Sequence, residues 1–253
     1  MKTLPLAVAF VAALALASSV QGQRAAAPSR AIMAAVADPT RPAEDSARDS
    51  DRHPAQILAF AGVRPGMRIV ELAPGGGYYT RLLARAVGPR GHVYAIVSPG
   101  FAARPEAIAR FRTLIAGYPN AEIVVSDIRT LTMAQPVDMV WTSENYHDFH
   151  NGQGADLAAI NRAVFGVLRP GGTYYVEDHA APGTGVTVTS TLHRIDPQAV
   201  RDEVTAAGFR LDGQSAVLAN AADPHSARSN DPSIRGRTDR FAMRFRRPAR
   251  QAG

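Results

Sequence analysis

The densest cluster of polar and titratable side chains is the segment 143–150, Ser-Glu-Asn-Tyr-His-Asp-Phe-His. A histidine exchanges protons near neutral pH, and a neighbouring carboxylate can orient its ring or act as a base itself. We therefore predict a catalytic group made of His147, Asp148, Tyr146 and Asn145, with His147 as the general base. The alternative is a hydrogen-bonded surface loop that caps the next helix.

The same part of the sequence also permits a metal site. His147 and His150 are three positions apart, and Asp178, His179 and His193 follow later in the chain. Imidazole nitrogens and carboxylate oxygens are ligands for zinc and similar ions. Since this spacing matches no known metal signature, our main prediction is no metal, and a site made of these five residues is the alternative.

A second segment, residues 69–80, is suited to holding a cofactor. Apolar residues typical of a strand lead into Gly75, Gly76 and Gly77, and a helical pattern follows. Glycines let backbone N–H groups approach a ligand closely, and a helix N-terminus favours a carboxylate or phosphate. The spacing differs from a dinucleotide fingerprint, and no Gly-Lys-Ser/Thr of a P-loop follows. The alternative is a packed turn without a ligand.

Short apolar segments alternate with helical ones as far as residue 176. We expect strands at 67–72, 92–97, 122–126, 137–141 and 173–176, helices at 54–61, 78–87, 105–116, 155–168 and 197–207, and two last strands at 209–211 and 241–245. This alternation predicts an α/β fold: a doubly wound, mostly parallel, seven-stranded sheet with helices on both faces and an antiparallel last strand. Ligands bind such sheets beyond the carboxyl ends of the strands, where both polar segments fall.

The composition restricts the kinds of partner. The 253 residues include no cysteine, which excludes disulfides and thiol chemistry. The net charge of +6 comes almost entirely from arginine, because Lys2 is the only lysine. The arginines near the C-terminus lack the interleaved aromatic residues of a single-strand binder, so a nucleic-acid partner is not favoured.

The first 22 residues predict a signal peptide. Lys2 precedes an apolar run from Leu4 to Ala17, which is too short to span a membrane, and small residues follow. We expect cleavage, export to the periplasm or the medium, and no stable membrane anchor. An uncleaved anchor and a cytoplasmic protein are the alternatives.

The rest of the chain suits one folded domain. Residues 23–50 are rich in alanine, proline, arginine and aspartate, and are expected to be a linker that leads into the domain and wraps it. The domain itself is predicted at 51–248, with a tail at 249–253.

Four landmarks, in this order, resemble class I S-adenosylmethionine-dependent methyltransferases. They are the glycine segment, Asp127 after the third strand, the polar loop after the fourth strand, and the Leu-Arg-Pro-Gly-Gly turn at 168–172. The resemblance covers residues 54–247. The sequences of segments 74–80 and 191–196 are similar to those of a poorly characterised group of exported predicted methyltransferases. It implies a Rossmann-like methyltransferase fold, S-adenosyl-L-methionine as cofactor and a small-molecule acceptor of unknown identity.

The resemblance also implies roles for individual residues. Glu71 would organise the loop and receive the amino group of the cofactor, Gly75 and Gly77 would allow its close approach, and Asp127 would accept the adenine amino group. For Asp127 a cap of the next turn is the alternative. The cofactor-binding residues expected in this way are Glu71, Ala73, Gly75, Gly77, Tyr79, Ser98 and Asp127.

Two of these positions depart from the family pattern. Ala73 stands where the family has its first glycine, and Ser98 stands near the end of the second strand, where the family has an acid that binds the ribose hydroxyls. A neutral hydroxyl makes a hydrogen bond roughly half as strong as a charge-assisted one.

The predicted function is methyl transfer from S-adenosylmethionine by direct displacement. Because the leaving group is already good, such an enzyme mainly aligns and desolvates the nucleophile. The alternative is an exported binding protein that keeps the fold, holds a small ligand or metal ion and has lost the reaction.

Overall fold

The computed structural model describes residues 27–152 and 154–249. The predicted signal peptide, the beginning of the predicted linker and almost all of the tail lie outside these ranges. Within them, no helix has the length and apolar character needed to cross a membrane.

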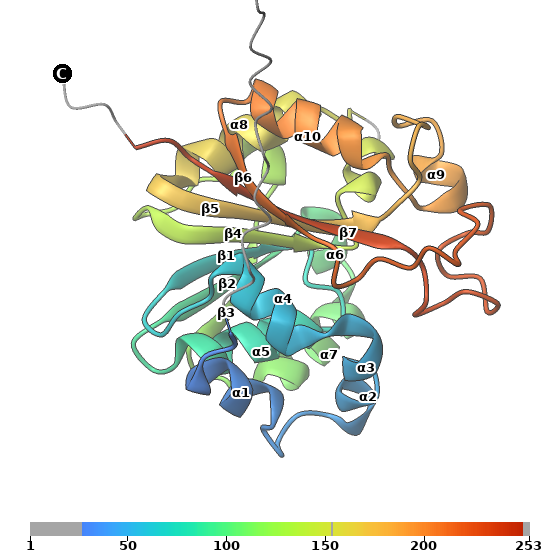
Figure 1. The fold of residues 1–253 in the computed structure, drawn as a ribbon. Coiled ribbons are helices and arrows are strands. Elements are labelled where there is room, and N and C mark those ends of the chain that lie inside the picture. The colour runs from blue at the N-terminus through green and yellow to red at the C-terminus, as the bar shows by residue number, and fades with distance from the viewer. Residues whose placement is uncertain (1–26, 153, 250–253) are drawn as a thin grey trace, which may run out of the picture.

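The centre of the domain is one seven-stranded sheet (Figure 1). Its strands are β1 (Arg68–Leu72), β2 (His92–Val97), β3 (Ala121–Val125), β4 (Val137–Ser143), β5 (Leu168–His179), β6 (Arg210–Ser215) and β7 (Arg240–Arg246). The order across the sheet is β3-β2-β1-β4-β5-β7-β6. Neighbours from β3 to β5 pair in parallel, while β7 is antiparallel to both β5 and β6. The predicted fold class, with its antiparallel last strand, is confirmed.

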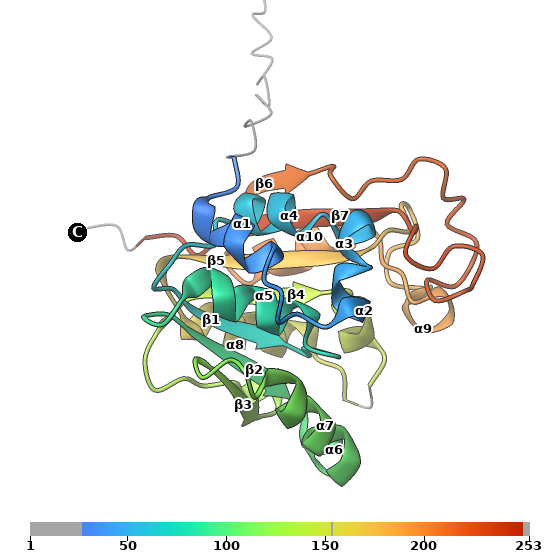
Figure 2. The same cartoon turned by 90° about the horizontal axis from the view of Figure 1, so that it is seen from below.

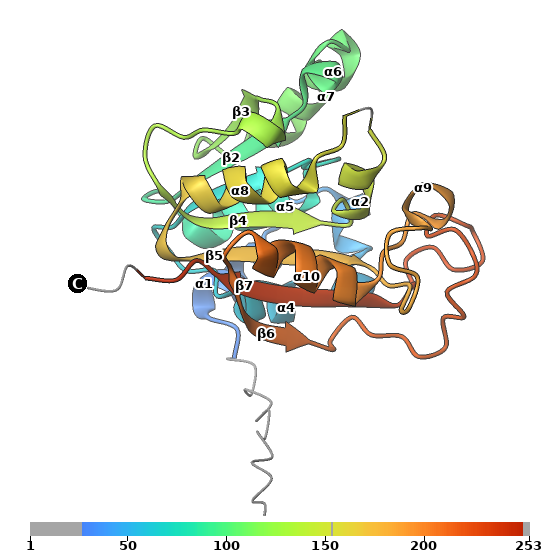
Figure 3. The ribbon, with the colours of Figure 1, turned by 90° about the horizontal axis from the view of Figure 1, so that it is seen from above.

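Helices cover both faces of the sheet. They are α1 (Arg30–Val36), α2 (Ala43–Ser46), α3 (Asp49–Arg52), α4 (Pro54–Ala61), α5 (Tyr78–Val87), α6 (Pro99–Ala102), α7 (Pro105–Ile115), α8 (Leu157–Val167), α9 (Thr189–Leu192) and α10 (Pro197–Ala206), with 3-10 turns η1 (Ile128–Thr130) and η2 (His147–His150). Figure 2 shows α1, α4 and α5 on one face, and Figure 3 shows α8 and α10 on the other.

Alternating side chains of the strands pack against these two layers of helices. On β1, Ile69 packs in one apolar cluster with Ile57 of α4 and Leu82 of α5. The next residue, Val70, packs in the opposite cluster with Ile160 of α8. Successive side chains of a strand point to opposite faces, so a strand covered on both sides carries apolar residues at consecutive positions, as Ile69 and Val70 do.

Local signals in the sequence set several helix ends. Pro54 and Pro197 occupy the first turns of α4 and α10, where a missing N–H costs nothing. Gly62 ends α4 with φ of 82°, a left-handed conformation that glycine adopts without strain. The helices predicted at 54–61 and 78–87 have these bounds in the structure.

The segment 168–172 differs from its predicted role as a turn. α8 ends at Val167, and β5 begins at once with Leu168, which pairs with Val137 of β4. The register then shifts before Met139, so the Arg-Pro-Gly-Gly residues form an irregular start of β5. Gly172 is needed there because a Cβ atom would lie 2.8 Å from the carbonyl oxygen of Arg169.

The described part of the predicted linker, residues 27–50, packs on the domain. α1 buries Ile32 and Ala35 and lies against α5. α2 contributes Asp45, which accepts a hydrogen bond of 2.7 Å from Nε of Arg81 on α5; the two residues are only 4% and 2% exposed. Arg81 also donates to the carbonyl oxygen of Gly76 at 3.0 Å, so this ion pair ties the N-terminal helices to the glycine turn.

We expect Asp45→Ala to lower the free energy of unfolding by about 3 kcal/mol, because it leaves the Arg81 guanidinium buried without its partner. Urea unfolding followed by circular dichroism measures this change. The matched control is Glu44→Ala at the exposed neighbouring position, for which a change within about 0.5 kcal/mol is expected. Equal midpoints for the two variants would contradict the role given to this ion pair.

Candidate active site

Three adjoining cavities lie beyond the carboxyl ends of the central strands. The wide cavity, of about 600 Å³, lies between the ends of β1, β2 and β3 and is lined by Ala73, Pro74, Gly75, Ile96, Val97, Ser98, Pro99, Phe101, Arg104, Asp127, Ile128, Arg129, Asn145 and Phe149. The narrow cavity, of about 160 Å³, is lined by Arg48, Arg52, Glu71, Leu72, Ala73, Pro74, Gly75, Gly76, Tyr78, Tyr79, Ser143, Glu144 and Asn145. The arginine cavity, of about 430 Å³, is lined by Arg48, Asp51, Arg52, Glu144, His179, Ser229, Asn230, Arg235, Gly236, Thr238 and Arg240.

These cavities share walls. The wide and narrow cavities have residues 73–75 and Asn145 in common. The narrow and arginine cavities share Arg48, Arg52 and Glu144. The arrangement is a row in which the glycine turn separates the first two cavities and Glu144 separates the last two.

The glycine turn has a left-handed backbone at Ala73, Gly75 and Gly77, with φ of 49°, 55° and 77°. Ala73 therefore adopts a backbone conformation that favours glycine, at the cost of some strain. Its carbonyl oxygen accepts a hydrogen bond of 3.0 Å from the side-chain amide of Asn145, which joins this turn to the loop after β4.

Gly77 has a different role from the predicted one. It does not line the three cavities, and a Cβ atom at this position would lie 2.9 Å from Nη1 of Arg81. The glycine is needed for the close approach of Arg81, whereas Gly75 lines both the wide and the narrow cavity.

Glu71 lies at the floor of the narrow cavity and is 3% exposed. Burial raises the pKa of its carboxyl group to about 8, although the hydroxyl of Thr80 donates to it at 2.6 Å. The side chain is therefore mainly protonated at neutral pH, and an ammonium group brought beside it would favour the carboxylate.

Ser98 and Asp127, two of the residues expected to bind the cofactor, line the wide cavity. Both also cap short helical turns: Ser98 accepts from the backbone N–H of Phe101 at 3.1 Å, and Asp127 accepts from that of Arg129 at 2.9 Å. The guanidinium of Arg129 lowers the pKa of Asp127. Asp127 therefore caps the next turn, as the alternative predicted, and its role in binding adenine stays a prediction.

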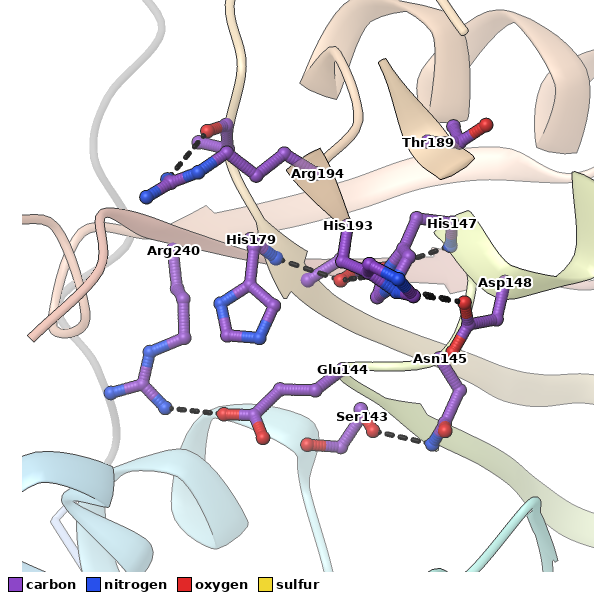
Figure 4. A network of polar contacts seen from close by, with 12 residues as sticks. Ser143, Glu144, Asn145, His147, Asp148, His179, Thr189, His193, Arg194 and Arg240 are labelled. Carbon is purple, nitrogen blue, oxygen red and sulfur yellow. Dashed lines mark hydrogen bonds and ion pairs between the residues drawn. The ribbon is translucent and has the colours of Figure 1, made fainter. Parts of the chain in front are cut away.

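Glu144 is the first residue after β4 and has an unusual backbone φ of 56°. Its Oε1 accepts a hydrogen bond of 2.8 Å from Nη1 of Arg240, and Arg52 pairs with its other oxygen (Figure 4). Burial opposes its ionisation, but Arg52, His179 and Arg240 outweigh burial and lower the pKa of Glu144.

A second buried carboxyl group, Glu177 of β5, places its Oε1 3.5 Å from the same Nη1 of Arg240 that contacts Glu144. The hydroxyls of Tyr79 and Tyr175 both donate to its Oε2, at 3.2 and 3.1 Å. Burial raises the pKa of Glu177, so Glu144 carries the negative charge of this network. Tyr79 lines the narrow cavity as expected, but its hydroxyl points to Glu177.

His179 follows at the end of β5 and lines the arginine cavity. Its Nδ1 lies 2.8 Å from the hydroxyl oxygen of Thr238. Burial lowers the pKa of His179, so the ring is neutral at neutral pH. When Nδ1 carries the proton, Nε2 is the basic nitrogen.

His147 has the opposite properties. It is 2% exposed, lines none of the three cavities, and places Nδ1 2.7 Å from Oδ1 of Asp178. Burial opposes protonation, but Asp178 and Asp148 outweigh it and raise the pKa of His147 to about 10. The role of His147 as general base stays a prediction, while His179 is neutral and lines a cavity.

The other predicted catalytic residues do not lie together in one cavity. Asn145 lines the wide and narrow cavities. Tyr146 is fully buried, accepts from the side-chain amide of Asn161 at 2.8 Å and lies 3.0 Å from a carboxylate oxygen of Glu203. Asp148 lies outside the three cavities, next to His147.

Of the five residues of the alternative metal site, the structure brings together His147 and His193, and Asp148 joins them. His150 lies 3.3 Å from Glu203 instead, and His179 turns to Thr238. Asp178 lies behind the ring of His147 rather than beside His193.

Arg52, Arg240 and Glu144 were not among the site residues predicted from the sequence. The position of Glu144, directly after a predicted strand and inside the polar loop, was a usable signal. No signal in the sequence distinguishes Arg52 and Arg240 from the other arginines, because their partner lies 92 and 96 positions away.

Comparison with known proteins agrees with this geometry. Residues 69–172 match a family model described as a methyltransferase domain. Over 74 residues the chain is 38% identical to the protein-L-isoaspartate O-methyltransferase of Ignicoccus hospitalis, which is 29% of this chain and 33% of that one. The chain thus spans about a third of the length of the first curated relatives that it matches.

Solved structures share the fold at low identity. A SAM-dependent methyltransferase from Aquifex aeolicus superposes with a TM-score of 0.54 at 16% identity, covering 76% of this chain and 88% of the other. The N-methyltransferase NodS from Bradyrhizobium japonicum gives a TM-score of 0.57 at 16% identity, covering 81% and 99%. These structures show that the chain has the class I methyltransferase fold, as its sequence predicted.

Proposed function

We propose that this protein is an S-adenosylmethionine-dependent methyltransferase whose cofactor occupies the wide and narrow cavities and whose acceptor enters the arginine cavity. The observation that carries the proposal is the row of three adjoining cavities, because direct methyl transfer needs an acceptor site that adjoins the cofactor site. Arg48, Arg52 and Glu144 line both the narrow and the arginine cavity.

The residues of the two cofactor cavities fit the two ends of this cofactor. The wide cavity combines apolar walls, such as Ile96 and Phe101, with the polar groups of Ser98 and Asp127, which suits an adenosine. The narrow cavity contains Glu71 and backbone groups of the glycine turn, which suits an amino-acid portion. When bound, S-adenosylmethionine supplies a methyl group on a sulfonium centre.

The residues of the arginine cavity would select and activate the acceptor. Arg48, Arg52, Arg235 and Arg240 give this cavity an excess of positive charge over Asp51 and Glu144. Guanidinium groups bind carboxylates and phosphates through paired hydrogen bonds, so we infer a small acceptor with an anionic group. His179 would remove the proton of the attacking hydroxyl or amine as the new bond forms.

We also propose that the mature protein is exported. The N-terminal basic residue, apolar run and small residues support this. N-terminal sequencing of the protein from fractionated cells should show a start near residue 23 outside the cytoplasm. An intact Met1 in the soluble cytoplasmic fraction would contradict export and favour the cytoplasmic alternative.

Calorimetric titration with S-adenosylhomocysteine tests the cofactor site. We expect saturable binding to the wild type and about three- to tenfold tighter binding to Ser98→Asp. That variant restores a charge-assisted partner for the ribose, and aspartate also suits the cap position of α6.

The matched control is Ser215→Asp on the edge strand β6, which should bind like the wild type. The absence of heat at high micromolar concentrations of folded wild-type protein would reject the proposed function and leave the binding-protein alternative.

His179→Gln tests the proposed base. With an acceptor found by screening small anionic hydroxyl and amine compounds for S-adenosylhomocysteine formation, kcat should fall about 10²–10⁴-fold while cofactor affinity stays unchanged. The pKa of His179 is lowered, so wild-type activity should stay constant near neutral pH and decline only as acid protonates the ring below its ordinary value. His92→Gln, at the start of β2, is the control. Retained activity in His179→Gln would assign the base elsewhere.

A further inference from the structure

We propose that His147, Asp148 and His193 form a binding site for one divalent transition-metal ion of the zinc type. The first two residues lie in η2, directly after the loop that follows β4, and His193 ends α9. The inference is independent of the proposed function, because none of the three residues lines the cofactor or acceptor cavities.

The three candidate ligand atoms form a nearly equilateral triangle (Figure 4). Nε2 of His147 lies 3.2 Å from Nδ1 of His193 and 3.3 Å from Oδ1 of Asp148, and the remaining side is 3.2 Å. An ion bound about 2.1 Å from each atom, the usual zinc distance, would see these ligands about 100° apart. That angle lies between octahedral and tetrahedral values, so no side chain has to move far to coordinate the ion.

Asp178 gives His147 the orientation that a metal ligand requires. Its carboxylate is fully buried, and Oδ1 lies 2.7 Å from Nδ1 of His147. The carboxylate also accepts hydrogen bonds from the backbone N–H groups of His147 and His179, both at 2.8 Å. Ligand histidines commonly donate their second nitrogen to such a carboxylate, which fixes the tautomer and directs the other nitrogen toward the metal. In this arrangement Nε2 of His147 faces His193 and Asp148.

The triangle is open to solvent on one side. The side chains of His193 and Asp148 are 27% and 47% exposed, while His147 is 3% exposed. Arg228 contacts the outer nitrogen of His193, but this exposed side chain has room to move away when that nitrogen becomes a donor. Three protein ligands and an open position are typical of zinc sites that keep a water molecule.

The donor set favours one class of ion. Two imidazoles and one carboxylate suit zinc, cobalt and nickel, whereas calcium and magnesium prefer oxygen ligands alone. The ion would join the loop after β4 to the end of α9. It would also lie near the proposed base, because the ring centroids of His147 and His179 are 6.1 Å apart.

The test uses the untagged, full-length protein, stripped with a chelator and titrated with zinc chloride, with calorimetry and elemental mass spectrometry as readouts. We expect one equivalent of zinc, and at least tenfold weaker binding for His193→Asn and for Asp148→Asn. Asparagine is chosen because His193 has a left-handed φ of 51°, which asparagine tolerates.

His225→Asn is the matched control. His225 also has a left-handed backbone, with φ of 58°, its side chain is 30% exposed, and it lies 2.9 Å from the carboxylate of Asp239. This variant should bind zinc like the wild type, and circular dichroism should confirm that every variant is folded. Uptake below 0.1 equivalent by folded wild type, or equal affinities for His193→Asn, Asp148→Asn and His225→Asn, would overturn the proposal.

Discussion

The ionised carboxylate of Glu144, held between Arg52 and Arg240, is the interaction on which the rest of the site depends. Arg52 ends α3 near the beginning of the domain and Arg240 begins β7 near its end, so this contact joins both ends of the domain to the loop after β4. Burying charged groups costs free energy that their attraction repays only in part. The network is therefore better explained by the cavity wall that it forms than by a gain in stability.

The backbone is also strained at two residues that line these cavities. Ala73 and Glu144 both have a left-handed backbone, and Asn145 donates to the carbonyl oxygen of Ala73. The N–H group of Glu144 donates to the carbonyl oxygen of Glu177 at 2.8 Å. Since several independent contacts determine these conformations, the strain is retained where the wide, narrow and arginine cavities meet.

The sequence predicts the features of this molecule that local patterns determine. Pro54 and Gly62 define α4 because a proline and a glycine act within their own turns. Glu71 and Asp127 were expected from the resemblance to the methyltransferase family, and they line the narrow and the wide cavity. The beginning of β5 at Leu168 was missed because it depends on pairing with Val137 across the sheet. Arg52 and Arg240 could not be found for the same reason, since contacts distant in sequence bring them to Glu144.

The different surroundings of two histidines explain why residue type and spacing alone do not determine the protonation state of a ring. His147 lies among several polar side chains, whereas His179 has fewer polar neighbours in the sequence. In the fold, the carboxylates of Asp178 and Asp148 surround the ring of His147 and favour its charged form, while burial keeps His179 neutral. A ring that retains its proton, or exchanges it for a metal ion, is a fixed positive centre. The neutral ring in the arginine cavity is the one able to accept a proton from a substrate.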